Sequence, residues 1–220
     1  MSDERADSLR SIPTATAKEI LRELGLEDPV IPGLRPFGGG SLVGRARTLR
    51  YLPWRGQPDP ERAGLGRRAI EQLGPGDVLV IDAMGRPEGA VLGDMLGTRA
   101  AQLGAVGAVV DGVVRDVGTF AELGLTVFAR GTHPDPARHH ITPWEWEVPI
   151  QCGGQLVEPG DWILADADAV LVIPDELADR VAAAGAERNR RDEQSQRLLK
   201  GGARLDDAYP LPPGADSKAA

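Results

Sequence analysis

The sequence predicts an α/β fold in which layers of mixed parallel and antiparallel sheet pack against flanking helices. Two observations support this prediction. Between residues 78 and 129, short apolar runs alternate with helical segments, an order that is typical of parallel strands joined by right-handed crossovers. After residue 148 the apolar runs follow one another across tight turns, as antiparallel strands do.

The first elements are a helix and a strand. The apolar spacing of residues 14–24 predicts a helix that is capped by Thr14 or Thr16 and ends at Gly25. Residues 41–52 mix β-branched, aromatic and alternating charged residues, which predicts a half-exposed strand. The remaining predicted elements are a loop at 57–60, a helix at 69–73, a strand at 78–81, a helix at 90–103, a strand at 105–110, a loop carrying residues 111–116, a short helix at 119–123, strands at 126–129, 148–157, 162–165 and 169–173, and a long helix from residue 175 with a charged continuation over 187–197.

The length of 220 residues fits one domain of ordinary size. We expect an N-terminal tail at residues 1–13, a single α/β domain at 14–200, and a C-terminal extension and tail at 201–220. The last few residues of this tail have a small, polar composition that is typical of disorder.

Charge and hydropathy exclude several classes of partner. The formal net charge of -8 opposes the attraction that holds most nucleic-acid-binding proteins to phosphate, so we expect no nucleic acid. No apolar run is long enough to cross a bilayer, so we expect no membrane partner. The polar first ten residues do not resemble a signal peptide, and the single Cys152 cannot form an internal disulfide, which together predict a cytoplasmic protein.

Several kinds of catalysis lack their usual residues. The three lysines lie near the ends of the chain, which argues against a Schiff base formed on a buried lysine. The chain has no GxxxxGK[ST] phosphate loop, and none of its serines lies in a GxSxG elbow. Nucleotide-dependent chemistry and serine hydrolysis are therefore not expected.

Acidic and basic residues follow two neighbouring parts of the predicted sheet. Asp94 lies at the start of a helix, where the backbone N–H groups of Met95 and Leu96 can hold a carboxylate. Arg115 and Asp116 follow the next buried strand, and an arginine can bind an oxyanion while an aspartate can hold a divalent cation. The same residues are also compatible with a plain helix cap and a solvated ion pair.

At these residues the chain resembles the RraA-like family, which contains class II 4-hydroxy-4-methyl-2-oxoglutarate aldolases and regulators of ribonuclease activity A. The resemblance spans about residues 35–210. It rests mainly on GDMLGTRAAQLGAVGAVVDGVVRD at 93–116, VFARG at 127–131 and VPIQCGGQLVEPGDWILADADAVLVIP at 148–174. It implies the RraA-like, swivelling-domain-type sandwich.

The resemblance also implies a site. The aldolases of the family carry an Asp, twenty intervening residues and then Arg-Asp, as Asp94, Arg115 and Asp116 do here. By this similarity Asp116 would anchor Mg²⁺ or Mn²⁺, Arg115 would bind the 2-oxo acid and stabilise an enolate, and the N–H groups of Met95 and Leu96 would hold the substrate carboxylate. Asp94 would position a water or a proton-shuttling network.

Two further features follow from the resemblance. A glutamate from the last helix of a neighbouring subunit completes the family's metal site, and we assign it to Glu193 rather than Glu187, in a homotrimer or hexamer. The family often has an acidic residue where this chain has Thr119, so the substrate end of the site is expected to differ.

The expected activity is metal-dependent cleavage of a 4-hydroxy-2-oxo acid to pyruvate, with decarboxylation of oxaloacetate as a companion activity. Two alternatives remain open. One is a non-catalytic, protein-binding regulator of ribonuclease activity, against which the intact Asp94, Arg115 and Asp116 argue. The other is a lyase acting on a sugar-derived acid.

Other conspicuous residues have simpler explanations. His133, His139 and His140 lack the spacing of a strong zinc site, so we interpret them as a solvated or substrate-lining loop. The alternation around Trp144 and Trp146 predicts an edge strand. Cys152 is predicted to be a buried filler, and Asp166 and Asp168 to serve a tight turn.

Overall fold

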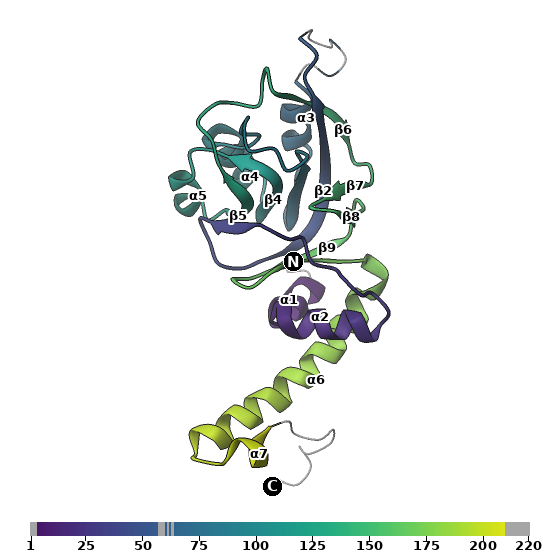
Figure 1. Cartoon of the computed structure of the whole chain (residues 1–220), viewed down its shortest axis with the longest axis vertical. Coiled ribbons are helices and arrows are strands. Elements are labelled where there is room, and N and C mark those ends of the chain that lie inside the picture. The colour runs from purple at the N-terminus through teal and green to yellow at the C-terminus, as the bar shows by residue number, and fades with distance from the viewer. Residues whose placement is uncertain (1–3, 57–59, 61, 63, 210–220) are drawn as a thin grey trace.

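The computed structural model describes residues 4–56, 60, 62 and 64–209. Figure 1 shows the arrangement of its elements. The helices are α1 (Glu4–Arg10), α2 (Thr14–Glu23), α3 (Leu65–Glu71), α4 (Asp94–Gln102), α5 (Gly118–Glu122), α6 (Asp175–Lys200) and α7 (Leu205–Ala208). The strands are β1 (Arg35–Phe37), β2 (Leu42–Pro53), β3 (Asp77–Asp82), β4 (Gly107–Val114), β5 (Thr126–Thr132), β6 (Ile141–Trp146), β7 (Ile150–Cys152), β8 (Gln155–Val157), β9 (Trp162–Ala165) and β10 (Val170–Ile173).

The main sheet has a parallel centre and antiparallel edges, as predicted. Its order is β1-β5-β4-β3-β2-β9-β10, in which the four strands β2 to β5 are parallel neighbours. On the side of β2 that does not face β3, this long strand pairs with β9 through Leu42–Arg45 and with β6 through Leu49–Pro53. The strand that carries Trp144 and Trp146 is therefore an edge strand, which confirms that prediction.

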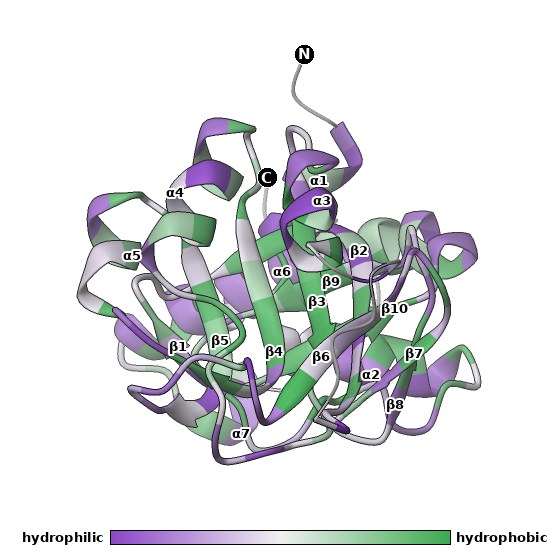
Figure 2. Cartoon of the chain, turned by 90° about the horizontal axis from the view of Figure 1, so that it is seen from above, coloured by the Kyte–Doolittle hydropathy of each residue, from purple (hydrophilic) through white to green (hydrophobic). Residues whose placement is uncertain are grey.

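Alternation along the central strands fills a core on each face of the sheet. In β3, Leu79 and Ile81 pack into the cluster beneath α3, α4 and α5, whereas Val78 and Val80 pack into the cluster on the opposite face. All residues of β4 are buried. Figure 2 shows β4 as largely hydrophobic, while α6 carries long hydrophilic stretches. Burial on both faces is what a parallel strand requires.

A third apolar cluster joins α1, α2 and α6 to β9 and β10. It corrects the predicted tail at residues 1–13, because Leu9 on α1 is fully buried there and Arg5 pairs with Asp179 on α6 at 2.7 Å. The C-terminal extension contains α7, while its residues 210–220 lie outside the described residues, as do residues 57–59 of the predicted loop. No described helix is both long and apolar enough to cross a lipid bilayer.

Several details of the predicted elements are wrong. Helix α4 begins at Asp94 rather than at residue 90, and β4 continues to Val114, so that Asp111 lies inside the strand rather than in a loop. The predicted antiparallel meander is two separate hairpins: β7 and β8 form their own two-stranded sheet, and β9 pairs with β2 and β10. These boundaries depend on hydrogen bonds between segments that are far apart in the sequence. Local sequence patterns do not encode such hydrogen bonds.

Candidate active site

The segment before α4 runs extended beside the end of β4. The backbone N–H of Val91 donates to the Val113 carbonyl at 3.1 Å, and the N–H of Arg115 donates to the Leu92 carbonyl at 3.0 Å. These two hydrogen bonds hold residues 91–93 against the end of the strand. They bring the start of α4 next to the Arg115–Asp116 pair. The predicted site residues before and after β4 therefore lie close together.

Gly93 makes this close approach feasible. A Cβ atom at Gly93 would lie 2.8 Å from Asp116 Oδ2 and 3.0 Å from Arg115 Cγ. Its φ of −151° is extended backbone, so space rather than backbone strain requires the glycine. Gly93 is a site residue that the family motif contains but that sequence reasoning did not single out.

Asp94 is the first residue of α4, and Gly93 is the N-cap of this helix. Asp94 Oδ1 accepts a hydrogen bond from the Met95 N–H at 2.7 Å, which satisfies one of the donors that a helix leaves unpaired in its first turn. The simpler interpretation of Asp94 as the N-cap is wrong, because Gly93 holds that position and Asp94 is the first residue of the helix. A substrate carboxylate would meet the Met95 N–H only after Asp94 releases it.

Arg115 and Asp116 form an ion pair of 3.2 Å between Nε and Oδ2. Their side chains are 41% and 44% exposed, so water screens the attraction and a ligand can replace it at small cost. Asp116 has a φ of +54°, in the left-handed region that aspartate tolerates better than most residues. Because Asp116 O also accepts the Thr119 N–H, the residue is held at the start of α5.

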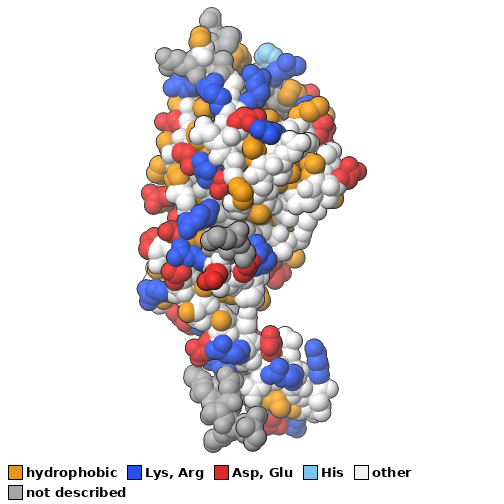
Figure 3. Space-filling view, turned by 180° about the vertical axis from the view of Figure 1, so that it is seen from behind, with side chains coloured by type: hydrophobic (Ala, Val, Ile, Leu, Met, Phe, Trp, Pro, Cys, Tyr) orange, Lys and Arg blue, Asp and Glu red, His pale blue; other side chains and the backbone are white. Residues whose placement is uncertain are grey.

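A pocket opens beside this pair. It gathers Asp94, Met95, Leu96 and Arg115 with three residues that the sequence analysis did not select, Tyr51, Arg67 and Arg138. Its remaining lining residues are Gly64, Gly66, Ala90, Val91, Leu92, Gly93, Pro136, Ala137 and Pro143. Figure 3 shows positively charged side chains gathered at the end of the molecule opposite α7. No local pattern marks the three additional residues, because α3 and the loop after β5 reach the pocket only in the folded chain.

The glutamates of α6 lie apart from Asp116 within one chain. The C-terminal half of α6, which carries Glu193, projects away from the sheet together with α7 (Figure 1). Glu193 is 4.0 Å from Arg197, and Glu187 is 3.9 Å from Arg191. Among the described residues, no three His, Cys, Asp or Glu side chains cluster as a metal site would require.

Asp116 alone is compatible with a water-rich cation site. Mg²⁺ keeps several water ligands and is commonly held by one or two carboxylates, with the substrate supplying further oxygens. A half-exposed carboxylate beside an open pocket provides such an anchor. The donor set of one chain therefore fits a hydrated Mg²⁺ or Mn²⁺ better than a closed, all-protein metal cage.

The histidines contribute little to the pocket. His133 Nδ1 accepts the Asp135 N–H at 3.2 Å, and His139 makes an edge-on contact with Trp54 at 6.2 Å between ring centroids. The pocket is lined by Pro136, Ala137 and Arg138 of the same loop, and not by the histidines themselves.

A buried polar network supports the sheet near the site. Asp111 accepts the Gly153 N–H at 2.8 Å and forms a short ion pair with Arg130, while Asp82 accepts the Gln151 side chain at 2.9 Å. Burial, helped by the charge of Asp111, raises the pKa of Asp82. These contacts attach the hairpin of β7 and β8 to β3 and β4.

Cys152 lies inside this supporting layer. It is fully buried, and burial raises the pKa of its thiol. A thiol that stays protonated is a poor nucleophile, so the residue is the buried filler that the sequence predicts. Asp166 also serves its turn, since its carboxylate accepts the N–H groups of Asp168 and Thr14.

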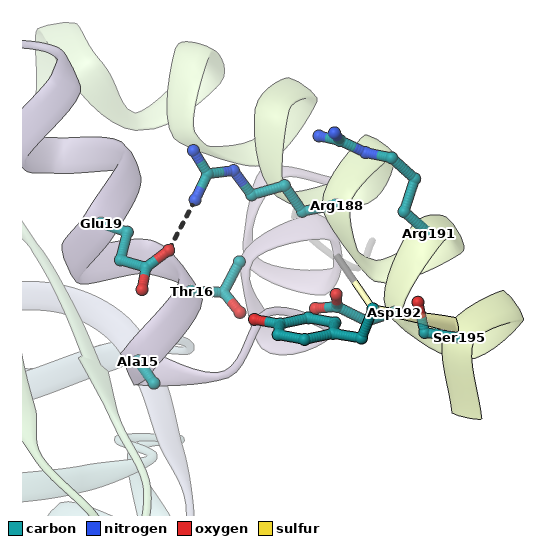
Figure 4. A pocket seen from close by; sticks show the side chains of 8 residues that line it. Ala15, Thr16, Glu19, Arg188, Arg191, Asp192 and Ser195 are labelled. Carbon is teal, nitrogen blue, oxygen red and sulfur yellow. Dashed lines mark hydrogen bonds and ion pairs between the residues drawn. The ribbon is translucent and has the colours of Figure 1, made fainter. Parts of the chain in front are cut away.

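A second pocket lies between α2, α6 and α7 (Figure 4). It is lined by Ala15, Thr16, Glu19, Arg188, Arg191, Asp192, Ser195 and Tyr209. Arg188 is held there by Glu19 at 2.9 Å and also by Glu23. None of the predicted catalytic or binding residues lines this pocket, so we place the candidate active site beside Arg115.

Comparisons with known proteins identify related sequences. The sequence profile described as RraA-like, Aldolase/RraA, matches residues 14–172. A protein of Halalkalibacterium halodurans, provisionally named 4-hydroxy-4-methyl-2-oxoglutarate aldolase, is 37% identical over 190 residues, covering 86% of each chain. A Burkholderia mallei protein with the same provisional name is 39% identical, covering 67% of this chain and 85% of its own.

The fold is also shared with a solved structure. Streptomyces coelicolor RraAS2, described as an unusual member of the RNase ES inhibitor RraA protein family, superposes with a TM-score of 0.81. It is 34% identical and covers 89% of this chain and 97% of its own. The profile match over most of the chain, the related sequences and the common fold agree, and they show that this chain belongs to the RraA-like family.

Proposed function

We propose that the protein is a divalent-metal-dependent class II aldolase that cleaves a 4-hydroxy-2-oxo acid, of the 4-hydroxy-4-methyl-2-oxoglutarate type, and releases pyruvate. The observation that carries the proposal is that Asp94 and Arg115 line one pocket and that Asp116 forms an ion pair with Arg115. The aldolase names of the related sequences support the assignment to the lyases. Decarboxylation of oxaloacetate is proposed as a side activity because it passes through the same pyruvate enolate.

Arg115 has the central part in this mechanism. Its guanidinium binds the 2-oxo acid and offsets the negative charge that develops on the 2-oxygen as the C3–C4 bond breaks. The N–H groups of Leu96 and, once Asp94 has released it, Met95 hold the substrate carboxylate. Asp94 then holds a water that takes the proton from the C4 hydroxyl, and protonation of the enolate at C3 gives pyruvate.

Asp116 is the residue proposed to hold Mg²⁺ or Mn²⁺. The cation would supply a Lewis acid at the 2-oxo group. With Asp116 engaged in holding a cation, the Arg115 guanidinium, which pairs with Asp116 in this structure, would be available for the substrate. Because Asp116 is a single carboxylate, we propose that Glu193 of a neighbouring subunit completes the set.

A homotrimer or hexamer is the assembly proposed for this arrangement. The projecting part of the chain supports it, because Leu198, Leu199, Leu205 and Tyr209 expose apolar side chains on α6, α7 and the residue after α7. Burying these residues against a second copy would remove apolar surface from water. Light scattering coupled to gel filtration measures the assembly, and a monomeric mass would contradict it.

A regulator of a ribonuclease is the second candidate function. The likeness to RraAS2 favours it, since that protein is described as a member of an RNase inhibitor family. Such a protein would act by surface contact and would not need Arg115. Inhibition of RNA cleavage that persists in an Arg115→Ala variant, combined with the absence of turnover, would favour the regulator.

The experiment that tests the proposal is release of pyruvate from 4-hydroxy-4-methyl-2-oxoglutarate and from oxaloacetate, followed by coupling to lactate dehydrogenase. Each substrate is assayed with Mg²⁺, with Mn²⁺ and with excess chelator, and metal without protein corrects for spontaneous decarboxylation of oxaloacetate. Turnover that requires metal supports the aldolase. Absence of turnover on both substrates by the assembled protein would contradict it and favour the regulator or the sugar-acid lyase.

A further inference from the structure

The pocket between α2, α6 and α7 contains an arginine whose hydrogen-bonding capacity is not used. Among the described residues, Arg191 Nε is the one buried side-chain nitrogen or oxygen that has no hydrogen-bond partner. One Nη of Arg191 lies 3.9 Å from the Glu187 carboxylate, which is too far for a hydrogen bond. A buried donor without an acceptor is unfavourable and rare in folded proteins. Because Arg191 lines a pocket, we expect a ligand to supply the acceptor.

The second arginine of the pocket is already neutralised. Arg188 donates to Glu19 at 2.9 Å, as Figure 4 shows, and it also pairs with Glu23. These two carboxylates belong to α2, so Arg188 joins α6 to α2 and has little charge left for a ligand. The two arginines are equally buried, with side chains 21% and 22% exposed, and they differ in their partners.

A carboxylate without a partner lies next to Arg191 in the chain. Asp192 lines the same pocket, and its side chain makes no ion pair or hydrogen bond within the described part of the chain. Since the charges of Glu19 and Arg188 offset each other, one cation and one anion remain available in the lining. A purely anionic ligand would be repelled by Asp192, and a purely cationic one by Arg191. A ligand that carries both charges would be attracted by both residues.

The rest of the lining is suited to a small polar molecule. Thr16 and Ser195 contribute hydroxyl groups, Tyr209 contributes a phenol, and Ala15 is the one lining residue without a polar side chain. The cavity volume is about 360 Å³, which is at the lower end of the range for small-molecule pockets. A large apolar ligand would therefore find neither the room nor the apolar surface that it needs.

We propose that this pocket binds a small zwitterion, an α-amino acid, with its carboxylate on Arg191 and its ammonium group on Asp192. A carboxylate bound side-on accepts hydrogen bonds from Nε and one Nη of a guanidinium together. Arg191 is able to turn toward it, because no hydrogen bond to a described residue holds its side chain. The site does not depend on the proposed function, since none of the proposed catalytic or metal-binding residues lines this pocket.

Calorimetric titration of the full chain with the standard α-amino acids, one at a time and without metal or substrate, tests the site. We expect at least one of them to bind with a Kd below about 1 mM. The amino acid that binds most tightly is then compared with two analogues that each lack one charge. For L-alanine these are propionate, which lacks the ammonium group, and L-alaninamide, which lacks the carboxylate.

The analogues decide whether the pocket recognises both charges. Loss of the carboxylate should weaken binding by about tenfold or more, because it removes hydrogen bonds to a charged group. Loss of the ammonium group should weaken binding by about two- to fivefold, since Asp192 is exposed and water screens its attraction. Absence of binding by every amino acid would overturn the proposal. Equal affinity for an amino acid and its analogue without the ammonium group would indicate a plain anion site and would overturn it as well.

Substitutions assign the binding to the named residues. Arg191→Gln should weaken the amino acid by about tenfold or more, and Asp192→Asn by about two- to fivefold. Arg190→Gln removes the same charge from an exposed neighbour that does not line the pocket, and it should keep the wild-type affinity. Arg115→Ala should also keep it, which excludes binding of the amino acid carboxylate at the candidate active site. Unchanged affinity in Arg191→Gln, or its loss in Arg115→Ala, would overturn the site.

Hydrogen exchange locates the bound amino acid and separates this inference from the proposed function. Peptides from α7 and from the C-terminal half of α6 should exchange more slowly with the amino acid bound, whereas peptides from α4 should not change. Slower exchange confined to α4 would contradict the site. A protein that binds the amino acid at α6 but releases no pyruvate would contradict the aldolase and support this site, and pyruvate release without such binding would contradict this site alone.

Discussion

Gly93 and Asp116 are so close that a methyl group on Gly93 would lie 2.8 Å from the Asp116 carboxylate. The two residues belong to different segments, and two backbone hydrogen bonds between residues 91–93 and the end of β4 hold them together. The geometry of the Arg115–Asp116 pair is therefore fixed by main-chain contacts. Side chains at the site are free to exchange their partners when a ligand enters.

A Gly93→Ala substitution should lower activity without unfolding the protein. The new methyl group would displace Asp116 and the Arg115 side chain, both of which are within 3.0 Å of it. We expect kcat/KM for pyruvate release to fall by roughly a hundredfold, as small displacements in a catalytic site can cause, while the melting temperature changes little. Gly40→Ala is the control, since no atom lies within 4 Å of its added Cβ. Unchanged kcat/KM in Gly93→Ala would contradict the proposed placement of the site.

An Arg115→Ala substitution should remove turnover. Loss of one group that stabilises the developing oxyanion typically lowers kcat by about a hundred- to a thousandfold. The ion pair with Asp116 is half exposed, so its loss should leave the free energy of unfolding nearly unchanged. Arg99→Ala on α4 removes the same charge from an exposed pair and should retain activity. An Arg115→Ala variant with wild-type kcat would remove this residue from the mechanism.

An Asp116→Ala substitution should raise the metal concentration needed for activity. The carboxylate is the proposed anchor of Mg²⁺ or Mn²⁺, and water cannot replace its charge. Titration of pyruvate release with Mn²⁺ should give a half-saturating concentration at least about tenfold above that of the wild type. The same metal dependence in both proteins would assign the cation to other residues.

Sequence patterns predicted the parts of the fold that depend on local periodicity. The apolar runs of β3 and β4 predict both strands and their parallel pairing. Asp94, Arg115 and Asp116 follow these two strands in the chain, which predicts that they are neighbours in the fold. The assigned roles of these side chains and of Glu193 stay predictions. That the start of α4 lies close to Arg115 and Asp116 follows from the neighbouring positions of β3 and β4 in the sheet.

Long-range contacts account for what the patterns missed. Residues 90–93 have helical spacing, yet hydrogen bonds to Val113 and Arg115 make them extended. Helix α1 has only about two turns, of mixed charge. It is stabilised by contacts with Asp175 and Asp179 on α6, which lie more than a hundred residues away in the sequence. Arg67 and Arg138 became candidates only when the fold placed them at one pocket.

An Arg130→Met substitution should destabilise the protein strongly. Asp111 is 3% exposed at its side chain, and Arg130 is the cation paired with it. Removal of one partner leaves a buried carboxylate without a counter-charge, which typically costs about 3–5 kcal/mol. Chemical denaturation at pH 7 measures the change. Arg130→Lys keeps the charge and should recover part of the loss, and an equal loss in both variants would show that packing of the guanidinium, rather than its charge, matters.

The pH dependence of stability should report the buried carboxyl of Asp161. Burial is the main cause that raises its pKa from 3.8 to about 6, although the carboxylate accepts the Glu158 N–H at 2.9 Å. Because the folded state holds this proton more tightly than the unfolded state, Asp161 contributes most to stability below pH 3.8, and this contribution is lost as pH rises to about 6. Asp161→Asn keeps an oxygen that can accept the Glu158 N–H and has no carboxyl to ionise. Relative to the wild type, the variant should therefore gain roughly 1–3 kcal/mol between pH 4 and pH 7. Urea denaturation across this range measures the difference, with Asp168→Asn on an exposed turn as the control. A difference between wild type and Asp161→Asn that does not change with pH would mean that Asp161 is ionised at the same pH in the folded and unfolded chains.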